Sequence, residues 1–330
     1  MRYFAVSEVV RIVLITSALF CLAGCKAGTE NVNTPSPKTY TYKTVGNCSI
    51  EADVYLPADR SKPLPAIVYL HSGALILNSR KEIIPEQLVQ YLEAGYAVIA
   101  IDYRLAPETK LPGIVSDLKD AFRWVYGQGP KLFGIDPNRV GVVGRSAGGY
   151  LTLMTGICVE PKPKVLVSSF GYGDLVGDWY TKPDPYYCTM PRVSREETGI
   201  RSDGPEVTSR GSKNEQAGKF YLYCRQNGLW PLEVGGRDPV KEREFFLPYC
   251  PLYNISGDYP PTMLLHGDQD KDVPYEQSVM MAKELDRNNV ENELVTVPGA
   301  GHGFDEDMDK PVVKEAFARA LTFLNRHLKK

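Results

Sequence analysis

A serine set between glycines is the position in this chain whose surroundings most clearly suggest chemistry. Residues 144–149 read GRSAGG and follow the apolar run Val140 to Val143, which is typical of a buried strand. In a tight strand-to-helix turn, glycines two residues before and two after the serine relieve the crowding that a Cβ would cause. The spacing therefore predicts that Ser146 is presented as a nucleophile, a role in which a serine hydroxyl needs a base and nearby backbone amides.

The backbone amides are expected in the loop that follows a second apolar run. After Ala66 to Leu70 the chain reads HSGA, residues 71–74. N–H groups in such a loop can receive the negatively charged oxygen of a tetrahedral intermediate. We therefore expect an oxyanion hole formed by the N–H groups of Gly73, Ala74 and Ala147.

The base, and the acid that orients it, are expected at two later strand ends. The segment VPGAGHGF, residues 297–304, places His302 between glycines after the last apolar run, and this histidine is the expected base. The segment LLHGDQDKDVP, residues 264–274, ends an earlier run with three carboxylates. The order serine, acid, histidine is that of the α/β-hydrolases. On the residues alone, the candidates for the acid are Asp268, Asp270 and Asp272.

Alternating strands and helices must carry these segments. Two extended segments come first, at Tyr40 to Val45 and Ile50 to Leu56. Apolar runs then predict strands over Ala66 to Leu70, Ala97 to Ile101, Val140 to Val143, Val165 to Ser168, Thr262 to Leu265 and Leu294 to Val297. Helical spacing predicts helices over Glu82 to Glu93, Ile114 to Tyr126, Tyr275 to Asp286 and Lys310 to Leu328. The alternation predicts an α/β fold with a mostly parallel central sheet covered by helices on both faces.

One stretch interrupts this alternation between the later strands. More than eighty residues rich in Pro, Gly, Tyr and charge separate Ser168 from Thr262. A structureless loop of that length is improbable in a compact domain, so we expect a partly helical cap insertion over about residues 171–258. Its aromatic residues can either line a substrate surface or pack the cap on the core; they are Trp179, Tyr180, Tyr186, Tyr187, Tyr221, Tyr223 and Trp230.

Residues Ala66 to Lys329 resemble an α/β-hydrolase of the hormone-sensitive-lipase and feruloyl-esterase-like branch. The resemblance rests on HSGA at 71–74, YRLAPE at 103–108, GxSxGG at 144–149, HGxxDxxVP at 266–274 and GHG at 301–303. It implies the α/β-hydrolase fold and a catalytic triad of Ser146, Asp270 and His302, because the family's acid stands three residues before Val-Pro.

The chain departs from the family pattern at a few positions. Ser72 and Ala74 stand where the family favours glycine, and Arg145 stands where this branch often carries Asp or Gly. We expect Arg145 to form a structural salt bridge. In the YRLAPE string, the charged residues Arg104 and Glu108, together with Asp102 before it, are expected to fix the loop below the site.

The N-terminus resembles the signal of a bacterial lipoprotein. An apolar stretch, Ile12 to Phe20, is short for a membrane-spanning helix and is followed by LAGC, residues 22–25. We expect residues 1–24 to be a signal peptide, Cys25 to be lipidated, residues 25–38 to be a flexible tether and residues 39–330 to be the hydrolase domain. An ordinary secretory signal is the alternative, and Lys26 favours sorting to the outer membrane of a two-membrane bacterium.

Charge and the positions of histidines and cysteines limit the partners, metal sites and disulfides that can be expected in this chain. The formal net charge of −2 over 330 residues gives no electrostatic reason to expect nucleic acid. The four histidines are scattered, so no zinc site is expected. Five cysteines lie beyond the N-terminal segment, and a disulfide would be most useful in the loop-rich region that holds three of them, although the pairing stays open; the five are Cys48, Cys158, Cys188, Cys224 and Cys250.

These observations together predict a serine carboxylic-ester hydrolase without a cofactor. Its substrates are expected to be small acyl esters or polysaccharide-linked esters outside the cytoplasm. A serine peptidase of the prolyl-oligopeptidase type shares the fold and the HGxxDxxVP turn, but fewer than 45 residues stand between Cys25 and the first core strands, too few for a propeller. A lipase and a non-catalytic binding protein are further alternatives; Ser146 disfavours a dehalogenase, and the oligomeric state stays open.

Overall fold

The computed structural model of the chain describes residues 34–329. Its centre is an eight-stranded sheet with the order β1-β2-β4-β3-β5-β6-β7-β8. The strands are β1 (Lys38–Val45), β2 (Cys48–Tyr55), β3 (Leu64–Leu70), β4 (Ala97–Ile101), β5 (Ile135–Arg145), β6 (Val165–Ser169), β7 (Thr262–Gly267) and β8 (Asn292–Val297).

The sheet is antiparallel at one edge and parallel elsewhere. Strand β2 pairs antiparallel with both β1 and β4, whereas every other neighbouring pair from β4 to β8 is parallel. The carboxyl ends of β3, β5, β6, β7 and β8 therefore meet at one edge of the sheet. This is the edge at which ligands are bound in open α/β sheets.

Helices cover both faces of the sheet, as the sequence predicts. The helices that pack on the sheet are α2 (Pro85–Glu93), α3 (Leu111–Phe133), α4 (Ala147–Cys158), α9 (Glu276–Arg287) and α10 (Pro311–Leu328). Helix α2 begins later than Glu82, because Pro85 occupies its first turn and residues Arg80–Glu82 form the short 3-10 helix η1. Helix α3 extends beyond Tyr126 and ends where Gly134 adopts a left-handed conformation.

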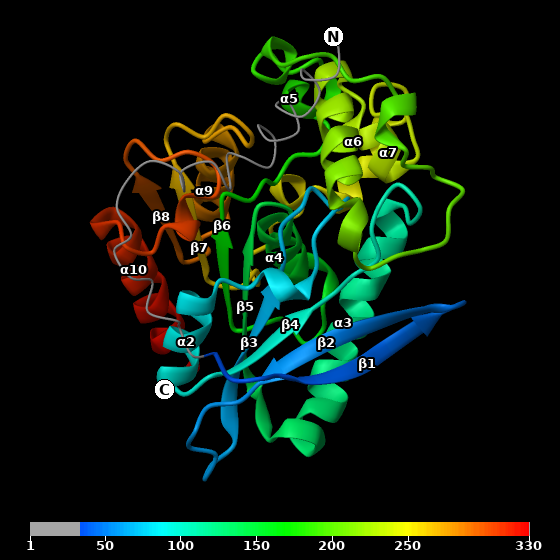
Figure 1. The fold of residues 1–330 in the computed structure, drawn as a ribbon. Helices are drawn as coiled ribbons and strands as arrows, with labels where there is room; N and C mark the ends of the chain where they lie inside the picture. Colours follow the sequence, from blue (N-terminus) through cyan, green and yellow to red (C-terminus); the bar gives the residue numbers. More distant parts are fainter. Residues whose placement is uncertain (1–33, 330) are drawn as a thin grey trace, which may run out of the picture.

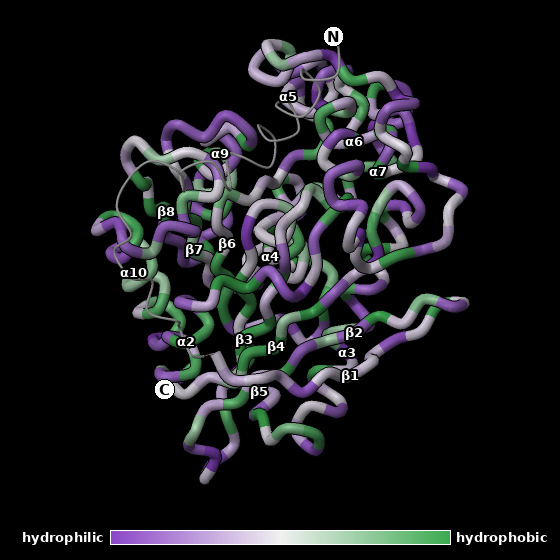
Figure 2. Tube along the Cα trace, in the orientation of Figure 1, coloured by the Kyte–Doolittle hydropathy of each residue, from purple (hydrophilic) through white to green (hydrophobic). Residues whose placement is uncertain are grey.

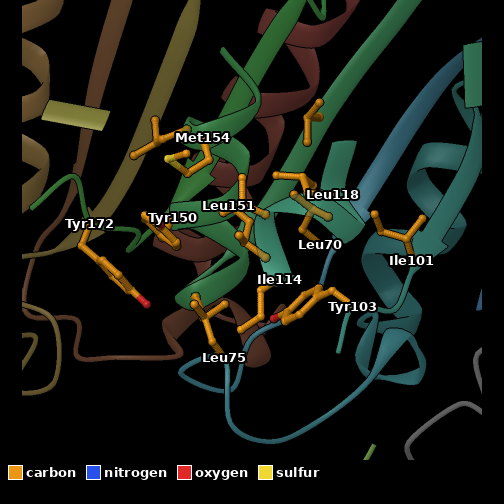
Figure 3. Close-up of a cluster of buried hydrophobic side chains, with 14 of the residues drawn as sticks. Leu70, Leu75, Ile101, Tyr103, Ile114, Leu118, Tyr150, Leu151, Met154 and Tyr172 are labelled. Carbon is orange, nitrogen blue, oxygen red and sulfur yellow. The ribbon is translucent and has the colours of Figure 1, made fainter. Parts of the chain in front are cut away.

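Alternation along the strands divides the core into two layers. Val68 and its alternate neighbours face a cluster with helices α3, α4 and α9, whereas Ile67 faces a second cluster with α2 and α10. Figure 2 shows the hydrophobic positions concentrated along the central strands β3, β4 and β5. Figure 3 shows the first layer, where Leu70 of β3 lies near Leu151 of α4 and Leu118 of α3. Strands buried on both faces keep the sheet edge that carries the functional loops rigid.

The expected insertion is present between β6 and β7, and residues 170–261 are called the cap segment below. It is partly helical, and Figure 1 shows α5, α6 and α7 together beyond the ends of the central strands. Its α-helices are α5 (Asp178–Thr181), α6 (Asn214–Asn227), α7 (Trp230–Gly235) and α8 (Arg243–Phe246). Its 3-10 helices are η2 (Tyr187–Thr189), η3 (Glu196–Thr198), η4 (Gly211–Lys213), η5 (Leu247–Tyr249) and η6 (Pro251–Tyr253).

The N-terminal assignments lie outside the described residues. These are the signal peptide over residues 1–24, the lipidated Cys25 and most of the tether over residues 25–38. Strand β1 begins at Lys38, one residue before the expected start of the domain. Among residues 34–329, none of the helices has the length and apolar character needed to cross a membrane.

Candidate active site

Ser146 lies at a strained turn between β5 and α4. Its backbone has φ 54° and ψ −120°, which is rare for a residue with a side chain. A Cβ on Gly144 would lie 2.2 Å from the carbonyl oxygen of Gly148, and a Cβ on Gly148 would lie 2.0 Å from that of Leu70. Glycine is therefore required on both sides of Ser146, and the first turn of α4 packs directly against the end of β3.

His302 connects Ser146 to Asp270. It lies in the loop after β8, just before the short 3-10 helix η7 (Phe304–Glu306). Its Nε2 is 3.0 Å from Ser146 Oγ, and its Nδ1 is 2.8 Å from Asp270 Oδ2. Because a carboxylate only accepts, Nδ1–H donates to Asp270, and Nε2 of the neutral ring accepts from the serine hydroxyl. The structure thus brings together the three residues expected to form the triad.

The carboxylate of Asp270 is buried and satisfied on both oxygens. Oδ1 accepts the backbone N–H groups of Asp272 and Val273, at 2.8 and 3.0 Å. Oδ2 faces His302 and lies 3.2 Å from Nε2 of His266. Burial acts to raise the pKa of this carboxyl group, but the charge of His302 and the hydrogen bonds from both histidines outweigh it and hold the pKa well below its usual value. Asp270 is therefore ionised at neutral pH.

Asp268, one of the other two candidates for the acid, has a structural role. Its Oδ1 accepts the backbone N–H of Gly299 at 2.7 Å, which ties the turn after β7 to the turn after β8. Asp270 alone among the three aspartates lies at Nδ1 of His302, so the geometry favours the assignment that the family resemblance implies.

His266 contributes to the site in a way that the sequence analysis does not anticipate. Its Nε2 lies 3.0 Å from the carbonyl oxygen of Val273 and must donate, so its Nδ1 accepts from the hydroxyl of Ser278 at 2.7 Å. The ring is fully buried and braces the turn that carries Asp270. The four-residue spacing in HGxxD is the only sequence signal for this contact.

The expected oxyanion loop has left-handed backbone conformations at consecutive residues. Gly73 has φ 110° and Ala74 has φ 53°. A Cβ on Gly73 would lie 2.2 Å from the carbonyl oxygen of Leu77, so this position needs glycine. Ala74 tolerates its conformation at a cost of about 1 kcal/mol. Its carbonyl oxygen accepts the indole N–H of Trp230 at 2.9 Å, which ties the cap segment to this loop.

Ser72, a departure from the family pattern, is held by hydrogen bonds to two side chains. Its hydroxyl donates to Glu82 Oε2 at 2.7 Å and accepts from Asn78 Nδ2 at 3.1 Å. Burial raises the pKa of Glu82 even though the charge of Arg145 and the bond from Ser72 lower it. The side chain of Ser72 therefore ties the oxyanion loop to η1 through Glu82.

Arg145 forms the salt bridge that we expected. Its Nη2 lies 3.0 Å from Asp305 Oδ1 and 2.7 Å from Glu306 Oε1, and its side chain is only 8% exposed. Both carboxylates follow His302 closely in the chain. Arg145 therefore joins the turn that presents Ser146 to the loop that carries His302.

The residues in and before the YRLAPE string also have structural roles, as expected. The hydroxyl of Tyr103 donates to the carbonyl oxygen of His71 at 2.9 Å. The charged residues form ion pairs that are buried or partly buried, and two of them involve residues of the cap segment. The pairs are Asp102 with Arg80, Arg104 with Asp117 and Glu206, and Glu108 with Arg210.

Most of the cap aromatics pack inside the protein. Tyr180, Tyr187, Tyr221 and Trp230 are buried, and Trp230 stacks on Tyr180 with 4.2 Å between ring centroids. Trp179, Tyr186 and Tyr223 are partly buried against the same core. Of the two roles considered for these residues, the structure therefore favours packing of the cap.

The structure answers the question of disulfide pairing that the sequence leaves open. All five cysteines within residues 34–329 are free. Cys224 and Cys250 are buried among apolar side chains, and Cys250 Sγ accepts the backbone N–H of Leu175 at 3.4 Å. Within the same residues, no group of three His, Cys, Asp or Glu side chains is arranged to hold a metal ion.

Family models match two parts of the chain. The BD-FAE model matches residues 52–167, which include the oxyanion loop and Ser146. The model of the prolyl oligopeptidase family matches residues 229–330, which include Asp270 and His302. Residues 168–228, which include helix α6, fall between the two matched ranges.

Curated relatives are much longer than this chain. It is 29% identical over 304 residues to the non-reducing polyketide synthase Preu6 of Preussia isomera, a match that covers 82% of this chain and 14% of the synthase. It is 26% identical over 377 residues to the non-reducing polyketide synthase ausA of Emericella nidulans, with coverages of 98% and 15%. The chain thus spans about one seventh of the length of these relatives.

Solved structures match nearly the whole described chain. An acetyl ester-xyloside bifunctional hydrolase from Caldicellulosiruptor lactoaceticus aligns with a TM-score of 0.65 at 21% identity, covering 89% of this chain and 97% of that one. Esterase 2 from Thermogutta terrifontis aligns with a TM-score of 0.62 at 23% identity, with coverages of 88% and 92%. An α/β hydrolase superfamily protein from Enterococcus faecalis aligns with a TM-score of 0.67 at 23% identity, with coverages of 88% and 98%. With the strand order and the turn at Ser146, these matches show that the chain has the α/β-hydrolase fold.

Proposed function

We propose that this chain is a serine carboxylic-ester hydrolase that forms an acyl-enzyme on Ser146. The observation that carries the proposal is the continuous path from Asp270 through both nitrogens of His302 to the Ser146 hydroxyl, with distances of 2.8 and 3.0 Å. A nucleophile, a base and an orienting acid in hydrogen-bond reach are what acyl transfer requires.

In the first step Ser146 Oγ attacks the ester carbonyl carbon while its proton passes to His302 Nε2. Asp270 holds Nδ1–H and thereby keeps the ring in the tautomer that can accept this proton. The backbone N–H groups of Gly73, Ala74 and Ala147 are the proposed donors to the oxyanion. Loss of one such donor typically costs about 3 kcal/mol of transition-state stabilisation.

The intermediate then collapses as Nε2–H gives its proton to the leaving alcohol. Water enters, loses a proton to the same nitrogen and attacks the acyl-enzyme, which releases the carboxylic acid and restores Ser146. Both steps use this chain's own side chains and backbone, and the proposal includes no cofactor.

The proposed substrates are small acyl esters, including acyl groups carried by polysaccharides. Support comes from the esterase and acetyl ester-xyloside hydrolase among the structural matches. The test is a series of 4-nitrophenyl esters from acetyl to palmitoyl. We expect kcat/KM to be highest for the shortest acyl groups, and a preference for palmitoyl would favour a lipase instead.

A serine peptidase is the second candidate, because the prolyl oligopeptidase family model matches residues 229–330. A dipeptidyl 4-nitroanilide, assayed beside 4-nitrophenyl acetate, separates the two activities. Preferential cleavage of the amide would support the peptidase and contradict the esterase. A purified protein that cleaves neither would favour a non-catalytic binding protein.

We also propose that the protein is exported and anchored to the bacterial cell envelope through a lipid on Cys25. The LAGC sequence at residues 22–25 supports this proposal. Acyl chains contribute about 0.8 kcal/mol per buried CH₂, so several chains anchor a protein stably. Labelling of cells with a clickable fatty acid should mark the wild-type protein, and label that persists after Cys25→Ala would contradict the anchor.

A further inference from the structure

Two carboxylates face the ring of His302, one at each nitrogen. Asp270 lies at Nδ1, as the triad requires, and Asp272 Oδ2 lies 3.3 Å from Nε2. The acyl-transfer steps need only Ser146 and the leaving group at Nε2. The second carboxylate therefore has no part in the mechanism described so far.

Asp272 is held rigidly by the cap segment. Its Oδ1 accepts from the hydroxyl of Tyr221 at 2.5 Å and from Arg225 Nη1 at 2.6 Å. Its backbone carbonyl oxygen accepts from both terminal nitrogens of Arg225 at 3.0 Å. With Oδ1 occupied by two donors, Oδ2 is the oxygen presented to the imidazole, and the side chain stays 17% exposed.

Arg225 itself is buried at considerable cost. Its side chain is 1% exposed, and it pairs with Asp184 at 2.6 Å as well as with Asp272. Aromatic rings surround its guanidinium with centroids 4.8 to 5.7 Å away; they are those of Trp179, Tyr180, Tyr187 and Tyr221. Since burying a charge is expensive unless it is paired, the two ion pairs of the terminal nitrogens of Arg225 hold the Asp272 carboxylate in a fixed position.

That position is beside the leaving group. In acylation, Nε2–H donates to the departing oxygen, which must come within about 3 Å of Nε2. Oδ2 of Asp272 is at a similar distance from the same nitrogen. A hydroxyl group on the carbon adjacent to the one that bears the departing oxygen can therefore reach Oδ2, and an ionised carboxylate accepts hydrogen bonds but cannot donate them.

We propose that Asp272, fixed by Arg225 and Tyr221, is a specificity-determining residue that selects leaving alcohols with a second hydroxyl group on the carbon adjacent to the one that bears the ester oxygen. Sugars and other polyols have this chemistry, whereas simple alkanols do not, and anionic alcohols are repelled. The inference rests on the proposed esterase function and specifies the alcohol side of its substrate.

The experiment compares 2-hydroxyethyl acetate with 2-methoxyethyl acetate. Both give the same acetyl-enzyme and have similar electronic effects on the ester, but only the first can donate a hydrogen bond to Oδ2. Because a hydrogen bond to a charged acceptor is strong, we expect kcat/KM of the wild type to be about tenfold higher for the hydroxyl compound than for the methoxy compound. Asp272→Ala should reduce this preference to nearly one.

A matched control tests whether the effect comes only from loosening Arg225. Asp184→Asn weakens the other ion pair of Arg225 but keeps an oxygen for the backbone N–H groups of Tyr186 and Tyr187. It should retain the preference. Asp272→Asn preserves the shape of the side chain and provides the measurement if Asp272→Ala fails to fold; it should lower the preference clearly.

The pH profile gives a second readout that loss of packing alone would not produce. Burial acts to lower the pKa of His302, but the charges of Asp270 and then Asp272 outweigh burial and the charge of Arg145, so the pKa is raised. The base works when neutral, so kcat/KM rises with pH through this pKa. Asp272→Asn should move the rising limb to lower pH.

The possible results separate the two proposals. Wild-type hydrolysis of both acetates without a preference would overturn this inference and leave the esterase proposal intact. A folded Asp272→Ala variant that keeps the preference would do the same. If the wild type hydrolyses no ester at all, the proposed function fails and this inference fails with it.

Discussion

The sheet core and the cap segment each contribute one buried arginine to the candidate site, and the two arginines do different things. Arg145 lies in the core beside Ser146 and binds Asp305 and Glu306, which follow His302. Arg225 lies in the cap and binds Asp272 across 47 residues of sequence. The first holds two reactive segments together, whereas the second fixes a carboxylate beside them.

The family matches follow the same division. Arg145 and its partners lie within the ranges matched by the BD-FAE and prolyl oligopeptidase models, whereas Arg225 lies between those ranges. The reactive groups and Asp272 lie within the ranges that the family models match, whereas the arginine that binds Asp272 lies in the segment between those ranges. Function of this kind is determined by the site rather than by the fold.

The largest effect is expected in the core, at the reactive residues. Ser146→Ala or His302→Ala should lower kcat for 4-nitrophenyl acetate by about 10⁴-fold or more, because the nucleophile and its base act as a unit. Steady-state kinetics measures kcat of each variant, and circular dichroism checks that the variant is folded. His327→Ala, on the C-terminal helix, should retain turnover. A kcat near that of the wild type in either variant would contradict the assignment of Ser146 as the nucleophile and His302 as the base.

The next largest effect concerns the core arginine. Arg145→Met should lower the free energy of unfolding by about 3 kcal/mol, because Asp305 is left buried without its cation. Urea unfolding gives this value, and kcat should fall as the loop of His302 loosens. Arg319→Met, at an exposed pair with Glu293, should change stability by less than about 0.5 kcal/mol. Equal losses of unfolding free energy in the two variants would contradict the stabilising role of the buried ion pairs of Arg145.

A smaller effect is expected where the cap meets the oxyanion loop. Trp230→Phe removes the N–H donor to the carbonyl oxygen of Ala74 and should cost about 1–2 kcal/mol of stability. Since Ala74 is a proposed oxyanion donor, kcat should fall more than KM rises. Trp124→Phe, where the ring packs on Tyr40 and Phe133, is the matched control and should leave kcat unchanged. An unchanged kcat in Trp230→Phe would show that the cap does not support the oxyanion loop.

The smallest effect concerns the cysteines. Because the five cysteines of the described residues are free, a reductant should change the melting temperature by less than about 1 °C. A disulfide in the cap would instead contribute about 2–4 kcal/mol. A drop of several degrees on reduction would therefore contradict the structure of the cap.

The core could be predicted from the sequence because its signals are local. Ser146, Asp270 and His302 each follow an apolar run, and parallel strands bring such ends to one edge of a sheet. The steric need for glycine at Gly144 and Gly148 is likewise a property of one turn. Local spacing therefore sufficed for the fold, Ser146 and His302, whereas the choice of Asp270 among three aspartates came from the family resemblance.

The contacts made by the cap could not be predicted in this way. Asp272 is the middle residue between Asp270 and Pro274 in a common motif, and nothing in its neighbourhood indicates Arg225 as its partner. The aromatic content of the cap is compatible with either a substrate surface or a packed interior. The contacts of His266 could not be predicted for a related reason, because its partners Val273 and Ser278 come close only when the turn after β7 folds back.

The most direct test of the central claim is to locate the adduct of a fluorophosphonate probe by peptide mass spectrometry. The proposed acyl-enzyme mechanism predicts one adduct, on the peptide that contains Ser146, which disappears in Ser146→Ala and forms far more slowly in His302→Ala. A wild-type protein that is folded but remains unlabelled, or that carries the adduct on another residue, would contradict it.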